Sequence, residues 1–346
     1  MTSTKNTALL TGGSGILGRA LIDELAEDFD LVCLRNRRAI TDPRVAAQFP
    51  GQLDTPMLGL SAKQYSDLAR QIDVIVHSAA VTNWKEAPTR IQEINLAGSS
   101  AMLRLAEAAQ APLYFISTAF IAHSPDGGEN FPGPAAYLRS KVAAEQLVRE
   151  SSVDSVMVRP SIISGSSVDG RMAAFQGLHR VLGGIVRGHV PFIPCNPNSL
   201  IDAVPQDLVA SAVGQLLRTQ VNRGEYWLTA GANALHASEL RDLCLNLSRE
   251  LELEVEPPRF IAGEAVDRLI LPLLEDVLPA KAQETFRDYL ELLWMFQVSD
   301  PLPTSMADLG FEAQLTRIAL QEAQAKSLRY WAKTKGLSPS NADQVA

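Results

Sequence analysis

A glycine-rich loop near the start of the chain restricts the possible fold more than any other sequence feature. The apolar run Ala8–Leu10 leads into Thr11-Gly-Gly-Ser-Gly-Ile-Leu-Gly18, and residues with helical spacing follow. Gly13, Gly15 and Gly18 have the G-x-G-x-x-G spacing. Without side chains, such a loop lets a pyrophosphate approach the backbone N–H groups at a helix N-terminus. The sequence therefore predicts a dinucleotide site that opens an α/β domain.

The first half of the chain alternates short apolar runs with helical patterns. Buried strands are predicted at 8–10, 31–34, 74–76, 113–116 and 156–158, and helices at 17–26, 62–71, 91–109 and 135–149. Strands and helices that alternate in this way form a parallel sheet covered by helices on both faces. We therefore predict a Rossmann fold, which is a doubly wound parallel sheet.

The pattern changes beyond about residue 165, where glycines interrupt the chain before a predicted helix at 201–217 and a predicted strand at 226–229. We predict an NADP-binding Rossmann domain over 1–165 and 200–235. A smaller, mostly helical substrate domain is expected over 166–199 and 236–335, with a flexible tail at 336–346. The apolar stretch 266–278 predicts a core helix, with a lid over the substrate as the alternative.

Composition restricts the partners and the compartment. The 346 residues carry 31 Lys and Arg against 39 Asp and Glu, and this net charge of -8 argues against a nucleic-acid partner. No signal peptide is recognisable, and no run of about 18 uncharged apolar residues predicts a transmembrane segment. The three cysteines are widely spaced and the five histidines are scattered, so we expect no metal site and a cytoplasmic, reducing location.

The end of the second predicted strand is rich in arginine. The stretch Cys33-Leu-Arg-Asn-Arg-Arg38 contains no acidic residue, and the first one that follows is Asp42. NAD enzymes usually place an acidic side chain here for the ribose hydroxyls, whereas guanidinium groups suit a 2′-phosphate. Arg35, Arg37 and Arg38 therefore predict NADPH (NADP) as the cofactor, with a solvated basic turn as the alternative.

A second motif suggests proton transfer. Tyr137 and Lys141 lie four residues apart on a predicted helix and thus on one face, where the ammonium would lower the pKa of the phenol. Thr118 follows the strand at 113–116 and is expected to hold a carbonyl oxygen beside Tyr137. Ser117 is more readily explained as a backbone cap. Asn95 is expected either in a relay to Lys141 or in a purely structural role.

These motifs resemble those of the extended short-chain dehydrogenase/reductases, and more narrowly the thioester reductase and fatty acyl-CoA reductase (male sterility-type NAD-binding) branch. The loop at 11–18 resembles TGxxGxxG, 73–80 the strand-four motif, 117–120 the STAY segment, 137–141 YxxxK, and 158–163 the segment that lines the nicotinamide. Residues 51–61 and 201–207 resemble the branch motifs GDLxxPxLGLS and DxVPVD. Gln52 and Trp84 depart from the branch pattern, which usually has an acidic residue and a Phe there.

The residue patterns and the resemblance together predict roles for named residues. Thr118, Tyr137, Lys141 and Asn95 would form the catalytic group. The cofactor would be held by Thr11, Gly12, Gly13, Ser14, Gly15, Ile16, Leu17, Gly18, Arg35, Arg37, Arg38, Leu53, Ser78, Ala79, Ala80, Lys141, Pro160, Ser161, Ile162 and Ile163.

The expected function is NADPH-dependent reduction of an acyl thioester, carried by coenzyme A or a carrier protein, to an aldehyde and then to an alcohol in a possible second step. One alternative is an extended-family reductase, dehydrogenase or epimerase acting on a ketone, a hydroxyl or a nucleotide sugar. Another is a non-catalytic NADP-binding regulatory protein. Because carrier proteins are commonly acidic, docking one would require a basic patch, for which Arg171, Arg180 and Arg187 are the candidates.

Overall fold

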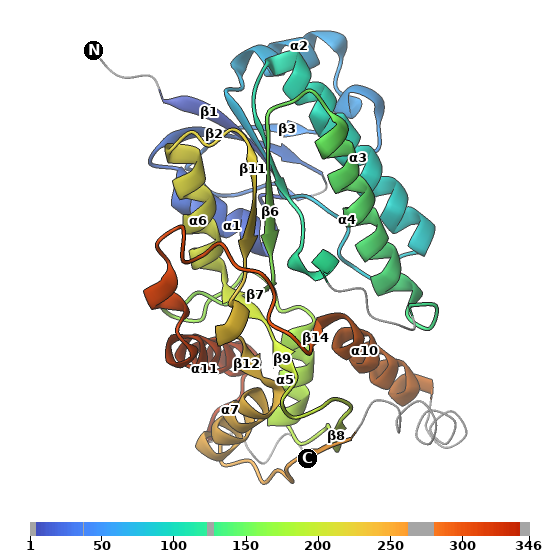
Figure 1. Cartoon of the computed structure of the whole chain (residues 1–346), viewed down its shortest axis with the longest axis vertical. Coiled ribbons are helices and arrows are strands. Elements are labelled where there is room, and N and C mark those ends of the chain that lie inside the picture. Colours follow the sequence, from blue (N-terminus) through green and yellow to red (C-terminus); the bar gives the residue numbers. More distant parts are fainter. Residues whose placement is uncertain (1–4, 37, 123–127, 262–279, 340–346) are drawn as a thin grey trace. The chain divides into compact units, whose positions relative to one another are not determined.

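The computed structural model describes residues 5–36, 38–122, 128–261 and 280–339 (Figure 1). The chain divides into two compact units: the first contains 1–161, 206–228 and 304–310, and the second contains 162–205, 229–303 and 311–346. From the sequence, 304–310 was expected in the substrate domain. Residues 162–165, 200–205 and 229–235 were expected in the Rossmann domain, and the two compact units divide the chain differently at all of these segments. The predicted lid stretch, 266–278, lies outside the described residues.

The first unit is built on a seven-stranded parallel sheet in the order β11-β6-β5-β4-β1-β2-β3. Its strands are β1 (Asn6–Thr11), β2 (Phe29–Arg35), β3 (Val45–Pro50), β4 (Val74–His77), β5 (Leu113–Ile116), β6 (Ser155–Pro160) and β11 (Gly224–Leu228). The strand order reverses between β1 and β4, where sheets of this type bind ligands at the carboxyl ends of their strands. The predicted doubly wound Rossmann fold is confirmed.

Helices cover both faces of this sheet (Figure 1). They are α1 (Ile16–Leu25), α2 (Ala62–Gln71), α3 (Pro88–Ala109), α4 (Pro132–Glu150) and α6 (Gln206–Arg218), with short 3₁₀ turns η1 (Pro56–Gly59) and η2 (Ala119–Ala122). α3 packs on α4, and α1 packs on α6. The core between sheet and helices contains Leu9, Ile75 and Leu113 from the strands and Met102 and Leu105 from α3, all fully buried. Burial of these apolar side chains is the main stabilising contribution.

The second unit consists of helices with short strand pairs. Its elements are β7 (Ile162–Ser164), α5 (Leu178–Val186), β8 (Phe192–Ile193), β9 (Leu200–Ile201), β10 (Ala203–Pro205), η3 (Gly231–Asn233), β12 (Leu235–His236), α7 (Ala237–Glu250), β13 (Arg259–Phe260), α10 (Ala280–Phe296), β14 (Gln297–Val298), η5 (Glu312–Leu315) and α11 (Arg317–Thr334). The predicted helix at 201–217 was wrong in its first turn. Residues before a proline favour extended backbone, so β10 ends at Pro205 and the helix begins at Gln206.

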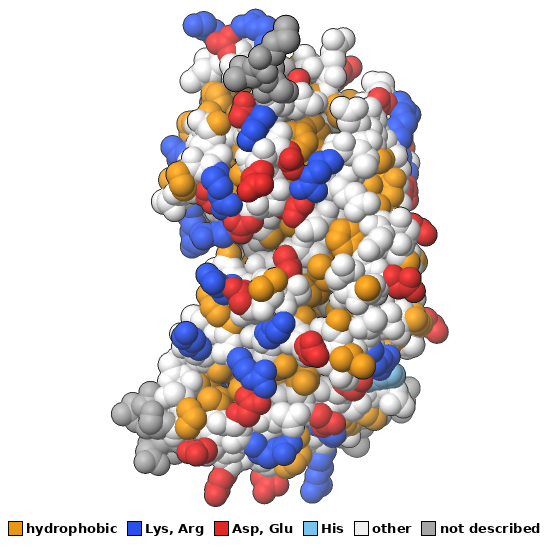
Figure 2. Space-filling model, turned by 90° about the vertical axis from the view of Figure 1, so that its left-hand side faces the viewer, with side chains coloured by type: hydrophobic (Ala, Val, Ile, Leu, Met, Phe, Trp, Pro, Cys, Tyr) orange, Lys and Arg blue, Asp and Glu red, His pale blue; other side chains and the backbone are white. Residues whose placement is uncertain are grey.

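The surface and the polar groups add three observations. Figure 2 shows acidic and basic side chains interspersed on the face to which α1 and α6 belong, where Arg218 pairs with Glu24 and Asp28. Within the described ranges, no helix is long and apolar enough to cross a membrane, and no group of His, Cys, Asp and Glu is arranged to hold a metal ion. The three cysteines are buried and unpaired with one another.

A buried ion cluster joins α4 to the sheet. Arg159 on β6 is only 2% exposed, and its guanidinium donates to both carboxylate oxygens of Glu145 at 2.9 and 2.7 Å. A third bond of 2.7 Å reaches Glu225 on β11, and the guanidinium lies 4.4 Å over the ring of Trp227. The desolvation of these charges is offset only while every partner is present.

Removal of one partner should therefore be costly. We expect Glu145→Ala to lower the free energy of unfolding by about 3–5 kcal/mol, because it leaves a buried guanidinium without its bidentate partner. Asp154→Ala is the matched control, since its pair with Arg223 is exposed and should contribute less than about 1 kcal/mol. Urea unfolding followed by circular dichroism measures both, and equal losses in the two variants would contradict this account.

Candidate active site

The glycine loop lies close to the backbone after β4, at the point where the strand order of the sheet reverses. Gly12 has φ +77°, and a Cβ there would lie 2.8 Å from the Ala79 nitrogen; one at Gly18 would lie 2.0 Å from the Gly12 oxygen. The cap of α1 is Gly15, which provides no side-chain bond to the first turn of the helix. The exposed Ser14 and Gly15 and the half-buried Ile16 thus form a loop whose amide groups suit a pyrophosphate. The residues present fit a dinucleotide.

A buried histidine anchors this loop to β4. The Thr11 hydroxyl lies 2.7 Å from Nδ1 of His77 and accepts the Ala79 N–H at 3.1 Å. Burial, helped by the charge of Lys141, lowers the pKa of His77 to about 3, so the imidazole is neutral and its Nδ1 can accept from Thr11. These bonds fix the half-buried segment Ser78–Ala80 against the loop. The sequence did not identify this role of His77.

The arginines after β2 separate into two groups. Arg44 donates to Asp42 at 2.9 and 2.6 Å, and these bonds lower the pKa of Asp42 to about 2. Arg44 also pairs with Asp23. Asp42 is therefore engaged by its neighbour rather than available to ribose hydroxyls. Arg35 is half-buried and Arg38 is exposed, and neither forms an ion pair with another described residue. Arg37 lies outside the described residues.

The predicted catalytic side chains meet at the carboxyl end of β5. The Thr118 side chain lies close enough to the phenol of Tyr137 to lower its pKa. The Lys141 ammonium donates to the Ile116 carbonyl at 2.9 Å and lies 5.1 Å from the Phe115 ring centroid. The structure therefore brings Thr118, Tyr137 and Lys141 to one strand end, where a carbonyl substrate would have two hydroxyl donors.

The pKa of Tyr137 differs from the expectation that Lys141 would lower it. Burial raises the pKa of Tyr137 to about 12, and the nearby Thr118 side chain acts to lower it. Burial also lowers the pKa of Lys141 to about 8, while nearby Glu145 acts to raise it. Among the groups of the protein itself, Thr118 rather than Lys141 thus favours the phenolate. Desolvation makes the protonated form of Lys141 less favourable.

Asn95 has structural partners. Its amide oxygen accepts the Val81 N–H at 2.7 Å, and its amide nitrogen donates to the Val81 carbonyl at 3.2 Å and to the Ser140 hydroxyl at 2.9 Å. Ser140 in turn donates to the Tyr137 carbonyl at 2.7 Å. These contacts fix the loop after β4 to the helix that carries Tyr137. They favour the structural alternative for Asn95 over a relay to Lys141.

Two buried hydroxyls lack partners at this edge of the sheet. Ser117 follows β5 and Ser161 follows β6, they are 4% and 7% exposed, and neither hydroxyl has a hydrogen-bond partner among the described residues. Ser117 was expected to cap a backbone group, and it does not. Buried hydroxyls without partners are costly, so both are suited to bind a ligand group.

The remaining predicted cofactor residues have varied surroundings. Pro160 is buried at the end of β6. Leu53 packs against Gly98 on α3, where a Cβ would lie 3.1 Å from Leu53 Cδ1. Ile162 and Ile163 belong to the second unit, where they form β7 beside β10.

The sequence missed three features around Tyr137. Glu145 lies four residues beyond Lys141, so the Y-x-x-x-K spacing extended by one more step would have identified it. The Trp84 ring lies 6.5 Å from the Tyr137 ring with an angle of 47° between the planes. Gly133 makes this approach possible, because a Cβ there would lie 2.3 Å from the Trp84 carbonyl oxygen. Gly133 lies between two prolines ahead of the helix predicted at 135–149, where a glycine indicated only a turn.

Fold and site together define an NAD(P)-dependent oxidoreductase of the extended short-chain dehydrogenase/reductase type. Residues 37–213, about half of the chain, match the family model described as "Male sterility protein". The chain belongs to this family.

Individual relatives are large proteins. The chain is 27% identical over 283 residues to a linear gramicidin synthase of Brevibacillus parabrevis, a match that covers 71% of the chain and 6% of the relative. It is 30% identical over 181 residues to a fusarin C synthetase of Gibberella moniliformis, a match that covers 45% of the chain and 5% of the relative. The chain thus spans only about one-twentieth of the length of these two relatives.

Solved structures share the fold over nearly the whole chain. The terminal R domain from the myxalamid PKS-NRPS pathway has a TM-score of 0.74 and 22% identity, with 97% of this chain and 92% of that domain covered. A reductase (R) domain of a Mycobacterium tuberculosis nonribosomal peptide synthetase has 0.66 and 20%, with 96% and 92% covered. A UDP-N-acetylglucosamine 4-epimerase from Methanobrevibacter ruminantium has 0.65 and 15%, with 96% and 99% covered.

The buried ammonium of Lys141 predicts a pH dependence of stability. Its pKa is about 8 when folded against an ordinary 10.5, so between these values the unfolded chain binds more protons and stability rises with pH. Relative to Lys141→Met, we expect the wild-type protein to gain about 2 kcal/mol between pH 7.5 and 10.

The measurement is urea unfolding of both proteins across this pH range. Replacement of Lys63, which is exposed on α2, by Met is the control and should leave the pH dependence of the wild type unchanged. A constant difference between wild type and Lys141→Met would show that Lys141 is not a desolvated ammonium.

Proposed function

We propose that this protein is an NADPH-dependent reductase of an acyl thioester, carried by coenzyme A or by the phosphopantetheine arm of a carrier protein. The product is an aldehyde, with further reduction to the alcohol as a second step. The observation that carries the proposal is that the hydroxyls of Thr118 and Tyr137 and the buried Lys141 lie together at the end of β5. Two donors at one strand end suit an oxygen that gains negative charge.

The side chains of the site supply the hydrogen bonds and the proton that the reaction needs. When bound, the nicotinamide cofactor supplies the hydride that the thioester carbon accepts. Thr118 and Tyr137 donate hydrogen bonds to the oxygen on which negative charge develops, and Tyr137 passes its proton to that oxygen. Lys141, with a pKa of about 8, is mostly protonated at pH 7, and its bond to the Ile116 carbonyl holds the ammonium at the same strand end. Expulsion of the thiol then leaves the aldehyde.

The choice of a thioester over a ketone or nucleotide sugar depends on sequence and relatives. Residues 51–61 and 201–207 resemble motifs of the thioester branch, and two of the similar structures are R domains of PKS-NRPS or nonribosomal peptide synthetase systems. The epimerase of similar fold supports the rival interpretation, since the fold serves both chemistries. A non-catalytic NADP-binding protein is the third interpretation, and the paired hydroxyls of Thr118 and Tyr137 disfavour it.

Basic residues are less available to a carrier protein than the sequence suggested. Arg171 pairs with Asp169, Arg180 pairs with Asp288, and the Arg187 guanidinium lies 4.9 Å over the Trp331 ring. These contacts offset much of the charge that would attract an acidic carrier. Assays should therefore include coenzyme A thioesters as well as carrier-bound ones.

The catalytic assignment is tested with reduced nicotinamide oxidation in the presence of acyl thioesters. We expect Tyr137→Phe to lower kcat about 10²–10⁴-fold through loss of the proton donor. Thr118→Val should lower it about 10²–10³-fold through loss of one oxyanion donor. Tyr65→Phe, on α2, is the matched control and should retain activity. Turnover of a ketone or nucleotide sugar without turnover of any thioester would overturn the proposed substrate class.

Cofactor choice is tested separately by binding. We propose that Arg35 and Arg38 hold the 2′-phosphate, and each charge-assisted contact contributes about 1.5–3 kcal/mol. Arg35→Ser combined with Arg38→Ser should raise the Kd for NADPH at least about 100-fold and leave that for NADH almost unchanged. Arg70→Ala, which removes an exposed arginine on α2, is the control. Fluorescence titration measures all of these Kd values, and equal weakening of both cofactors would contradict the assignment.

A further inference from the structure

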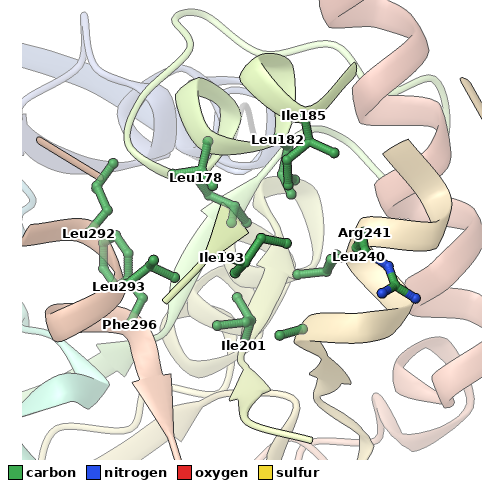
Figure 3. A pocket seen from close by; sticks show the side chains of 12 residues that line it. Leu178, Leu182, Ile185, Ile193, Ile201, Leu240, Arg241, Leu292, Leu293 and Phe296 are labelled. Carbon is green, nitrogen blue, oxygen red and sulfur yellow. The ribbon is translucent and has the colours of Figure 1, made fainter. Parts of the chain in front are cut away.

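Three charged side chains of the first unit are buried between α4 and the sheet. Lys141, Glu145 and Arg159 are 5%, 1% and 2% exposed. Long charged side chains normally keep their charged ends in water. Arg241 does so at an apolar pocket of the second unit, where Figure 3 shows its guanidinium turned away from the space enclosed by the other labelled side chains. Because buried charges are weak evidence of stabilisation, their burial beside Tyr137 points to a function.

Glu145 connects Lys141 to a group of four charges. It lies one helical turn beyond Lys141, so the two side chains share a face of α4. Its carboxylate accepts from Arg159 at 2.9 and 2.7 Å and from Arg149 at 2.7 Å. Both guanidinium groups also reach Glu225, at 2.7 and 2.9 Å. These four side chains form the Arg159 cluster, in which the formal charges cancel and Glu145 is the member whose charge acts on Lys141.

The elements packed around Lys141 present uncharged groups to it. Burial lowers the pKa of His77 to about 3 and raises that of Tyr137 to about 12, so both are neutral at pH 7. Glu145 thus supplies the negative charge that opposes the desolvation of the ammonium. The uncharged groups are the His77 imidazole on β4, the Phe115 ring and the Ile116 carbonyl on β5, the Tyr137 phenol on α4, and, from α3, the Asn95 amide bonded to Ser140.

The charge of Lys141 matters for the contacts that this side chain can make. Lys141 is one of the residues expected to bind the cofactor. An ammonium has three N–H donors, of which the Ile116 carbonyl takes one. A hydrogen bond from a charged donor is roughly twice as strong as one from a neutral donor. Loss of the proton would therefore weaken every bond from Lys141 to the oxygen atoms of a ligand.

We propose that Glu145 is a positioning residue of this active site, whose carboxylate keeps Lys141 charged at the pH of turnover and its bonds to the cofactor charge-assisted. The inference rests on the proposed reductase function and adds the means by which the site stays active at neutral pH. The Arg159 cluster extends this control to Arg149 and Glu225, which are each 41% exposed. A purely structural Glu145 would hold α4 to β6 without any effect on the proton of Lys141.

The first test changes Glu145 and measures the pKa of Lys141 directly. NMR titration of protein labelled with carbon-13 at the lysine Cε gives this pKa, and Lys141→Met identifies the signal. Glu145→Gln should lower the pKa by about one pH unit or more, because it removes the opposite charge from the same helix face. Glu145→Asp retains a carboxylate and should remain close to the wild type. Glu150→Gln makes the same change at an exposed position of α4 and is the matched control.

Two variants at the exposed edge of the Arg159 cluster should shift the pKa of Lys141 in opposite directions. Arg149→Met leaves an excess of negative charge and should raise it, whereas Glu225→Gln leaves an excess of positive charge and should lower it. Solvent screens both positions, so we expect a shift of roughly 0.2–0.7 pH unit in each case. If Glu145→Gln does not fold, these two variants decide the test, because partial unfolding would raise the pKa toward its ordinary 10.5 in both.

The functional measurement is the Kd for NADPH across the same pH range, by fluorescence titration. We expect the Kd to rise on the alkaline side, and this rise should begin at lower pH in Glu145→Gln but not in Glu145→Asp or Glu150→Gln. A pKa of Lys141 that is unchanged in Glu145→Gln and in both variants of the cluster edge overturns the inference. A shifted pKa with an unchanged Kd profile also overturns it. If both shift but no thioester is reduced, the role of Glu145 is supported and the proposed function is overturned instead.

Discussion

The site depends on one face of α4 that is attached to the sheet at three points in succession. Tyr137, Lys141 and Glu145 are spaced by four residues, so they share a face, and each binds a different part of the sheet edge. Tyr137 lies near Thr118 beyond β5, Lys141 donates to a carbonyl of β5, and Glu145 accepts from Arg159 on β6. Because all three contacts use the same helix, a shift of α4 that serves one contact disrupts the other two. The positions of the reacting groups are therefore set by the packing of a whole helix.

The attachment of α4 to the sheet requires the desolvation of charged groups. Lys141 and Glu145 are 5% and 1% exposed, so both charged groups are desolvated. The low pKa of Lys141 and the high pKa of Tyr137 have the same cause. Burial favours the neutral form of each group, which lowers the pKa of an amine and raises that of a phenol. Glu145 limits the penalty at Lys141, although its closer bonds go to Arg159. A ligand that brings hydrogen-bond partners to this edge would offset the desolvation penalty of Lys141 and Tyr137, and this gain would strengthen its binding.

The sequence predicted most strands and helices of the first unit, and the shared helix face of Tyr137 and Lys141, because these depend on local patterns. Periodic apolar residues, a glycine loop and the Tyr137–Lys141 spacing can each be recognised without knowledge of the neighbours. Contacts between distant segments could not be predicted in this way. The partners of Asn95, the anchoring role of His77 and the close approach at Gly133 each depend on which strands and loops become adjacent. The half-exposed edge strand β3 shows no clear alternation of apolar and polar residues, and it was missed.

Ion pairing within the fold decides which of the basic residues in the sequence are available to ligands. Arg35, Arg38 and Arg44 are close together in sequence, yet Arg44 is held by two carboxylates, whereas Arg35 and Arg38 pair with no other described residue. The same reasoning removes Arg171 and Arg180 from consideration, because each has an acidic partner. A chain with a net charge of -8 has acidic residues to spare, so most arginines acquire a carboxylate during folding. An arginine that remains without one at the end of β2 is therefore a stronger indication of a phosphate site than the number of arginines in the segment.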